Sequence, residues 1–199
     1  NGASSLTIVT TDDLVMSGLI GSTTPLTKLN ISTTSGNLTF GQNISVSGTG
    51  TDALIMNAGS SEAAGTSTGG NIIVSGSPTI TMGTGGRATL MTGSVSGSAG
   101  VTTLIGSGTS HFRYNSDETN TNYSVALGSG VYAIYREQPT LTITADDKTM
   151  TYGPTVPSLT TTVSGLQNGD TTAVLSSSAS VSVGGSVSAA GYYVQGAHT

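Results

Sequence analysis

Short apolar-x-apolar triplets recur through the first part of this 199-residue chain, separated by glycine, serine, threonine and asparagine. Side chains alternate across a β-strand, so each triplet sends its two outer side chains to one face and its central side chain to the other. Helical periodicity is absent, and the 29 glycines of the chain would penalise helices. We therefore expect short strands with one buried face. The clearest triplets are Leu6-Thr7-Ile8, Leu14-Val15-Met16, Leu29-Asn30-Ile31, Leu38-Thr39-Phe40, Ile44-Ser45-Val46, Leu54-Ile55-Met56, Ile72-Ile73-Val74 and Ile80-Thr81-Met82.

An internal repeat suggests how these strands are arranged. The best match aligns residues 43–48 with residues 71–76, so that Ile72 follows Ile44 by 28 residues. Units of this length that cannot bury their own apolar face are typical of solenoids, and we predict a right-handed parallel β-solenoid. Asparagine or glycine at each corner would tolerate the left-handed backbone of a tight bend. Residues 59–70 are predicted to form a projecting loop. Because the spacing of the triplets is irregular, a β-sandwich of short strands stays open as the alternative.

Aromatic and charged residues appear together at about 111–137. Apart from Phe40, no aromatic residue precedes this segment. The end of a solenoid exposes unpaired backbone and apolar core, so it needs a bulky, partly charged cover. We assign residues 1–137 to the β-solenoid and 111–137 to its aromatic cap.

Residues 138–199 have the pattern of a separate unit of strands and turns. Asn168-Gly169-Asp170 is a strong turn signal. Pro154 and Pro157 fit only outside a central strand, because proline lacks a backbone N–H. We predict a small antiparallel β-sandwich. Its expected strands are 141–144, 159–163, 173–175, 181–183 and 192–194.

The C-terminal part also resembles a known family. The segments 142–148, Thr151-Tyr152-Gly153 and 163–171 resemble the MBG (YGX-type) domain, a bacterial Ig-like module, over about residues 141–199. The family usually continues Tyr-Gly with Asp, whereas Pro154 stands here. It also runs on to a final Asn-Tyr-containing strand. The resemblance thus implies an Ig-like domain that is incomplete at its C-terminal edge.

The preceding part is similar to the β-helical passenger of filamentous-haemagglutinin-like exoproteins of two-partner secretion. The similarity rests on the Asn-Ile-x-Val-Ser-Gly runs, on residues 53–56 and on the segment 107–139. Together the two resemblances imply a secreted bacterial surface adhesin, or a structural protein of an extracellular matrix or filament. In it, a rigid β-helical stalk would carry an Ig-like spacer outside the cell, and this chain would be one piece that lacks the native start.

Composition argues against two classes of partner. Only 8% of residues are charged, with 5 Lys+Arg against 10 Asp+Glu, so the chain lacks the basic surface that nucleic acid requires. No apolar run approaches the roughly 18 residues of a membrane-spanning helix, and we expect no membrane insertion. The absence of cysteine excludes disulfides and thiolate sites.

Catalytic and metal-binding patterns are missing from the sequence. His111 and His198 are the only histidines and the acids are scattered, so we expect no metal, no cofactor and no catalytic residue. The chain has two adjacent acidic pairs, Asp12-Asp13 and Asp146-Asp147. Within each pair the two side chains would point to opposite faces of a strand, so we expect solvation at the surface or a weak calcium contact. We predict that the protein is not an enzyme. A β-helix polysaccharide-degrading enzyme is the less favoured alternative, and it would need His111, Arg113, Asp117 and Glu118 to converge in a groove.

The aromatic segment supplies the candidate ligand-binding residues. Tyrosine rings can stack on sugar rings while an arginine donates hydrogen bonds, although aromatic clusters more often pack together. The candidates are Arg113, Tyr114, Tyr123, Tyr132 and Tyr135. The expected partners are surface glycans or matrix polysaccharide. Self-association into fibres is a further expectation, if a neighbouring chain adds a strand to the incomplete C-terminal domain. Plain truncation of a longer protein is the alternative explanation of that edge.

Overall fold

The computed structural model describes residues 4–194 and 196, and most of its regular structure is β-strand. The expected all-β class is confirmed. The elements are β1 (Ser5–Thr10), β2 (Leu14–Met16), β3 (Lys28–Thr33), β4 (Leu38–Phe40), β5 (Ile44–Ser45), β6 (Leu54–Ala58), β7 (Ile72–Val74), β8 (Ile80–Thr81), β9 (Arg87–Thr92), α1 (Val101–Ile105), β10 (Phe112–Arg113), β11 (Gly130–Tyr135), β12 (Thr142–Ala145), β13 (Thr161–Ser164) and the 3-10 helix η1 (Thr172–Val174). Six of the eight predicted triplets lie entirely in one of these strands, and the triplets at 44–46 and 80–82 extend one residue beyond β5 and β8.

The chain divides into two compact units. Unit 1 consists of residues 1–139 and 167–170, and unit 2 consists of residues 140–166 and 171–199. The short segment 167–170 therefore belongs to unit 1, although the residues on both sides of it belong to unit 2.

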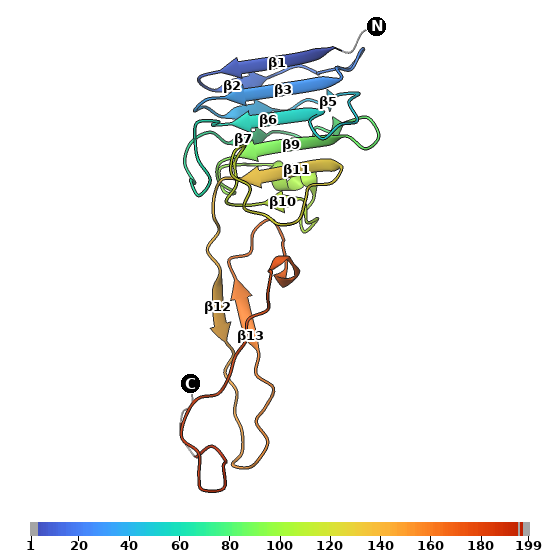
Figure 1. Cartoon of the computed structure of the whole chain (residues 1–199). Coiled ribbons are helices and arrows are strands. Elements are labelled where there is room, and N and C mark those ends of the chain that lie inside the picture. Colours follow the sequence, from blue (N-terminus) through green and yellow to red (C-terminus); the bar gives the residue numbers. More distant parts are fainter. Residues whose placement is uncertain (1–3, 195, 197–199) are drawn as a thin grey trace. The chain divides into compact units, whose positions relative to one another are not determined.

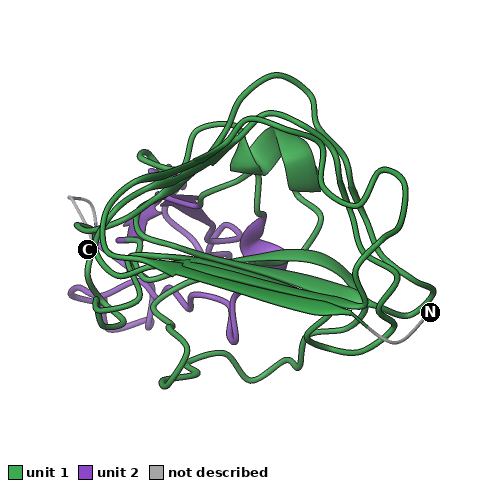
Figure 2. Ribbon diagram, turned by 90° about the horizontal axis from the view of Figure 1, so that it is seen from above, with its two compact units in different colours: residues 1–139, 167–170 green, residues 140–166, 171–199 purple. Residues whose placement is uncertain are grey.

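Every strand pair that the structure describes in unit 1 is parallel. The largest sheet has the order β1-β3-β6-β9-β11-β10, and two smaller sheets have the orders β2-β4-β7 and β5-β8 (Figure 1). Seen from above, the coils of unit 1 lie over one another around a common interior (Figure 2). Successive passes of the chain are thus joined by backbone hydrogen bonds.

The parallel register places equivalent side chains in columns. Leu6, Leu29, Leu54 and Ala88 occupy one column of the largest sheet. Ile8, Ile31, Met56 and Leu90 occupy the next column on the same face. Apart from Leu6 and Ile8 on the outermost strand, all of these side chains are fully buried. The apolar-x-apolar triplets therefore build a continuous core along the stack.

The internal repeat predicted from the sequence aligned residues 43–48 with residues 71–76. This prediction is wrong, because the two segments do not occupy equivalent positions in the sheets. Ile44 pairs with Ile80, whereas Ile72 pairs with Leu38 in another sheet. The two matched segments share a sequence pattern because each begins a strand at a corner of the coil.

Asparagines at these corners serve a different purpose from the one expected. In the described residues, the non-glycine positions with positive φ are Ser110, Asn115 and Asn168. The corner asparagines instead accept backbone hydrogen bonds through their side-chain oxygens. Asn37 Oδ1 accepts from Asn71 N at 2.9 Å, and Asn71 Oδ1 accepts from Ser94 N at 2.9 Å. This ladder joins consecutive coils at the corner where β4 and β7 begin.

The end of unit 1 departs from sequential stacking. β11 lies between β9 and β10, so the last long strand is inserted beside an earlier one. The short helix α1 contacts β7 and β11, although no helical pattern was predicted. The chain path of residues 101–135 at this end was not evident from the sequence.

Unit 2 contains less regular structure than expected. β12 and β13 form an antiparallel pair, and Val187 makes an isolated antiparallel bridge to Tyr193. The strand expected at 173–175 is replaced by η1, and residues 181–183 form no strand. None of the described residues of unit 2 is buried. These segments therefore have no apolar core against which further strands could pack. Within residues 4–194 and 196, no helix has the length and apolar content needed to cross a bilayer.

Candidate functional site

The aromatic segment separates into two groups because side chains alternate across β10 and β11. Phe112 lies opposite Ala133, and Tyr135 lies opposite Thr92, on the face that carries the core columns. Tyr132 and Arg113 lie on the outer face of the same sheet. The five candidate residues therefore do not form one binding surface.

The inner group is a packed aromatic cluster. Tyr135 is fully buried, and its ring stacks on Tyr114 with 5.6 Å between centroids. Phe112 lies 6.4 Å from Tyr135 in a tilted arrangement. Burial raises the pKa of Tyr135 to about 12. A tyrosine in this environment packs against the core and does not present its ring face to a sugar.

A turn from the C-terminal part of the chain occupies the polar side of this cluster. Asn168 Nδ2 donates to the Tyr114 hydroxyl at 3.0 Å, and the same hydroxyl donates to Asp170 Oδ2 at 2.8 Å. Asn168 Oδ1 accepts from Thr102 Oγ1 at 2.5 Å and from the Tyr135 hydroxyl at 3.5 Å. Burial and the neighbouring Asp170 carboxylate raise the pKa of Tyr114 above 10.0. The tyrosine hydroxyls are thus already bonded within unit 1.

The backbone of the same turn is held equally closely. Asn168 has a φ of +51°, and its carbonyl accepts from Gly108 N at 2.9 Å. Gly169 follows with a φ of +75°, and a Cβ atom there would lie 1.9 Å from Ser107 Oγ. The Asn-Gly pair is required because both residues adopt the left-handed conformation and glycine leaves room for Ser107.

The outer group is built around Arg113. Its guanidinium carbon lies 5.4 Å from the Tyr123 ring centroid and 5.7 Å from that of Tyr132. Tyr132 is buried, stacks on His111 at 4.3 Å and accepts a hydrogen bond from Gly128 N at 3.1 Å. Tyr123 is half-buried. Of the four candidate tyrosines, Tyr123 is the one that is both partly exposed and adjacent to the Arg113 guanidinium on the outer face.

Sequence reasoning missed the most deeply buried charge. Arg136 directly follows β11 and is fully buried. Its guanidinium donates to the carbonyl oxygens of Ala58 and Gly70, the latter at 2.8 Å, and to Asn57 Oδ1 at 3.4 Å. Burial lowers its pKa. The sequence feature that could have indicated a buried arginine is its position directly after an apolar strand, in a chain with only 5 Lys+Arg.

Asp117 is the second buried charge in this region. Its carboxylate accepts from Ala64 N at 2.7 Å, from Thr119 N at 2.7 Å and from Asn120 N at 2.5 Å. Burial alone would raise the pKa of Asp117, but the hydrogen bonds from Asn120, Ala64 and Thr119 lower it well below 3.8. This carboxylate stabilises two loops and is not free for acid–base chemistry.

A polysaccharide-degrading enzyme would need four side chains to converge in a groove, and each of them makes its own local contacts instead. These residues are His111, Arg113, Asp117 and Glu118. Arg113 Nη1 donates to the carbonyl oxygens of Ser110 and Phe112, and His111 stacks on Tyr132. Glu118 is exposed beside the turn that Asp117 organises. Among the described residues, no group of three or more His, Asp or Glu side chains is placed to hold a metal ion.

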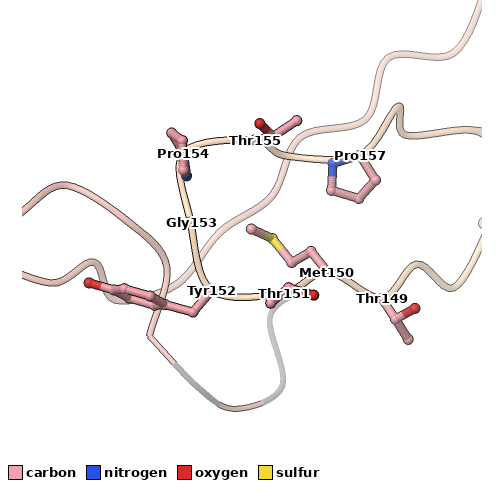
Figure 3. A pocket seen from close by; sticks show the side chains of 8 residues that line it. All are labelled: Thr149, Met150, Thr151, Tyr152, Gly153, Pro154, Thr155 and Pro157. Carbon is pink, nitrogen blue, oxygen red and sulfur yellow. The ribbon is translucent and has the colours of Figure 1, made fainter.

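Two open pockets lie away from these residues. The first, of about 400 Å³, is lined by residues 149–155 and 157, which form a single loop of unit 2 (Figure 3). The second, of about 450 Å³, lies in unit 1 between residues 19–25 and 43–45. None of the five candidate ligand-binding residues lines either pocket, and neither lining contains a charged side chain.

Comparison with known families identifies one part of the chain. Residues 141–198 match the MBG domain (YGX type). The match includes the Asn168-Gly169-Asp170 turn that bonds to Tyr114. No curated protein and no solved structure matches the chain.

Proposed function

We propose that this protein is a structural segment of a secreted bacterial surface adhesin or extracellular matrix filament. Residues 1–137 act as a right-handed β-solenoid stalk with an aromatic cap, and residues 138–199 act as an Ig-like spacer. The observation that carries the proposal is the parallel register of the six-stranded sheet β1-β3-β6-β9-β11-β10. Strands hydrogen-bonded to the previous and the next coil produce a stiff rod with a continuous core.

Two further features support a structural role. The Asn37–Asn71–Ser94 hydrogen-bond ladder links neighbouring coils at their corners. The tyrosine hydroxyls of the cap are used internally by Asn168 and Asp170. Most of the polar groups that could have bound a ligand therefore stabilise the end of the stalk.

The MBG match supports the location. A module of this kind resembles the Ig-like domains of bacterial surface proteins, and it occupies residues 141–198. We propose that the protein acts outside the cell, inserts into no membrane, binds no nucleic acid and catalyses no reaction.

Surface labelling of the producing bacterium tests this proposal. An antibody raised against the purified chain should label intact cells or the matrix around them, and added protease should remove the label. Labelling only after lysis would contradict an extracellular role.

Glycan binding is the second candidate, and Tyr123 favours it. The Tyr123 ring is half-buried beside the Arg113 guanidinium, as a sugar-stacking residue would be. Surface glycans or matrix polysaccharide would be the ligands. Binding on a glycan array that disappears in Tyr123→Ala but persists in Tyr152→Ala would support this function, whereas the stalk alone predicts no signal that depends on Tyr123.

Self-association through unit 2 is a further proposal about partners. No described residue of unit 2 is buried, and Ile143 on β12 is 53% exposed. A strand added by another chain would supply the missing layer and could join copies into fibres. Light scattering that grows with time at high concentration would support it, and a constant particle size would contradict it.

A further inference from the structure

The turn at residues 167–170 contains a dipeptide that is prone to chemical change. Asparagine precedes glycine at Asn168-Gly169, and glycine has no side chain to shield its backbone nitrogen. That nitrogen can attack the side-chain carbon Cγ of the asparagine, which forms a five-membered imide and releases the amide nitrogen as ammonia. Water then opens the imide to aspartate or isoaspartate. The turn that belongs to unit 1 therefore contains a deamidation sequence.

The fold holds the Asn168 amide away from this reaction. Asn168 is 7% exposed, and both polar atoms of its side chain are bonded. Nδ2 donates to the Tyr114 hydroxyl at 3.0 Å, while Oδ1 accepts from Thr102 and Tyr135. Closing the imide ring would draw Cγ toward the Gly169 nitrogen and away from these partners. The reaction therefore requires the turn to open first.

The product does not fit the closed turn. The Tyr114 hydroxyl has one proton, which it donates to Asp170 Oδ2 at 2.8 Å. An oxygen in place of Asn168 Nδ2 would face that hydroxyl without a proton between them, and a second carboxylate would lie beside Asp170. Isoaspartate would also lengthen the backbone by one carbon, although Gly108 N fixes the Asn168 carbonyl at 2.9 Å. Closing the turn is therefore unfavourable after the reaction.

We propose that Asn168-Gly169 is a deamidation site that records opening of the 167–170 turn. The closed turn protects the amide, the open turn allows ring closure, and the converted turn cannot regain the bond from position 168 to Tyr114. Because the chemical change is irreversible, it accumulates with the time that the turn spends open. This inference is independent of the stalk and glycan functions proposed above.

Mass spectrometry of the full chain tests the protection. The wild type is incubated in mildly alkaline buffer, with and without guanidinium chloride, and its peptides are scored for the gain in mass and for isoaspartate. We expect conversion of Asn168 to be at least about tenfold slower without denaturant, because the bonds that must break keep the open fraction small. Asn71 is the internal control, since the β-branched Ile72 follows it, and it should stay unchanged in denaturant. Equal rates at Asn168 in the two solutions, or conversion of Asn71 as fast as that of Asn168, would overturn the proposal.

Two conservative variants test the contacts. Tyr114→Phe removes the acceptor for Nδ2, and Thr102→Val removes a donor to Oδ1. Each should speed conversion of Asn168 in buffer by about threefold or more, with no change in denaturant. Tyr152→Phe, which removes a hydroxyl bonded to Ser188 in unit 2, is the matched control and should leave both rates unchanged. The same rate in all three variants would contradict the proposal, and Thr102→Val decides if Tyr114→Phe fails to fold.

The properties of the product give an independent measurement. Converted chains carry one more negative charge, so ion exchange separates them from intact chains. They should unfold at a lower temperature than the intact chains, and Asn168→Asp, which reproduces the aspartate product, should do the same. Wild-type stability of both would show that the turn accepts the product, and would overturn the proposal.

Discussion

The Asn168 side-chain amide donates a hydrogen bond to the Tyr114 hydroxyl across 3.0 Å, although 54 residues separate them in the sequence. This contact brings a turn of the MBG-matched segment into unit 1. It also removes two of the four candidate tyrosines from any binding surface, because Tyr114 and Tyr135 both bond to the same asparagine.

Replacing Asn168 should destabilise unit 1. Asn168→Ala loses the bonds to Thr102, Tyr114 and Tyr135 and forces alanine into a left-handed backbone, so we expect a loss of about 3 kcal/mol in the free energy of unfolding. Asn168→Gly loses the same bonds without the backbone penalty and should cost about 1 kcal/mol less. Urea denaturation followed by circular dichroism measures both. Equal stability of Asn168→Ala and wild type would contradict the role of this turn.

Arg136 should be the least replaceable cation. Arg136→Met would leave the buried carbonyl oxygens of Ala58 and Gly70 without this donor, and we expect a loss of about 3 kcal/mol. Arg113→Met is the matched control, because Arg113 is half-buried and bonds to carbonyls of its own loop, and it should cost about 1 kcal/mol or less. Thermal unfolding of the two variants checks the difference. The account of Arg136 would be wrong if both variants melted alike.

The asparagine ladder predicts a smaller effect. Asn71→Ala removes the acceptor for Ser94 N, and we expect a loss of about 1–2 kcal/mol. Asn30→Ala, on the outer face of β3, should change stability by less than about 0.5 kcal/mol. Hydrogen exchange should show faster loss of protection at Ser94 in Asn71→Ala than in Asn30→Ala. If the ladder did not contribute to stability, Ser94 would exchange at the same rate in Asn71→Ala and Asn30→Ala.

Asp117 should make unit 1 sensitive to acid. Because the pKa of Asp117 is lower in the folded protein than its ordinary 3.8, its contribution is complete above that value and is lost as the pH falls below it. Asp117→Asn should be less stable at neutral pH and should show a shallower loss of stability below about pH 4. Glu118→Gln, the exposed neighbour, should retain the wild-type profile. Denaturation curves at several pH values compare the three proteins, and parallel profiles for wild type and Asp117→Asn would refute this assignment.

The regular part of the fold was predictable, because triplets such as Leu38-Thr39-Phe40 mark a strand and its buried face by local alternation. The pairing of the strands was not predictable, since Ile44 and Ile72 have the same local pattern but lie in different sheets. The insertion of β11 between β9 and β10 depends on long-range packing. The site was predicted as one group of residues, but side chains alternate along β11, and Tyr132 and Tyr135 therefore lie on opposite faces. Arg136 and Asn168 act through partners distant in the sequence.

The most direct test of the central claim, that unit 1 is a stack of parallel coils, is a disulfide between neighbouring coils. Thr39 pairs with Ile73 in parallel register, and both side chains point outward between core positions. The double variant Thr39→Cys/Ile73→Cys should form an intramolecular disulfide readily on mild oxidation, because adjacent strands lie within disulfide range. Ser45→Cys/Ile73→Cys, which the sequence repeat alone would pair, should not. Cross-linking of the second pair and not the first would contradict the account.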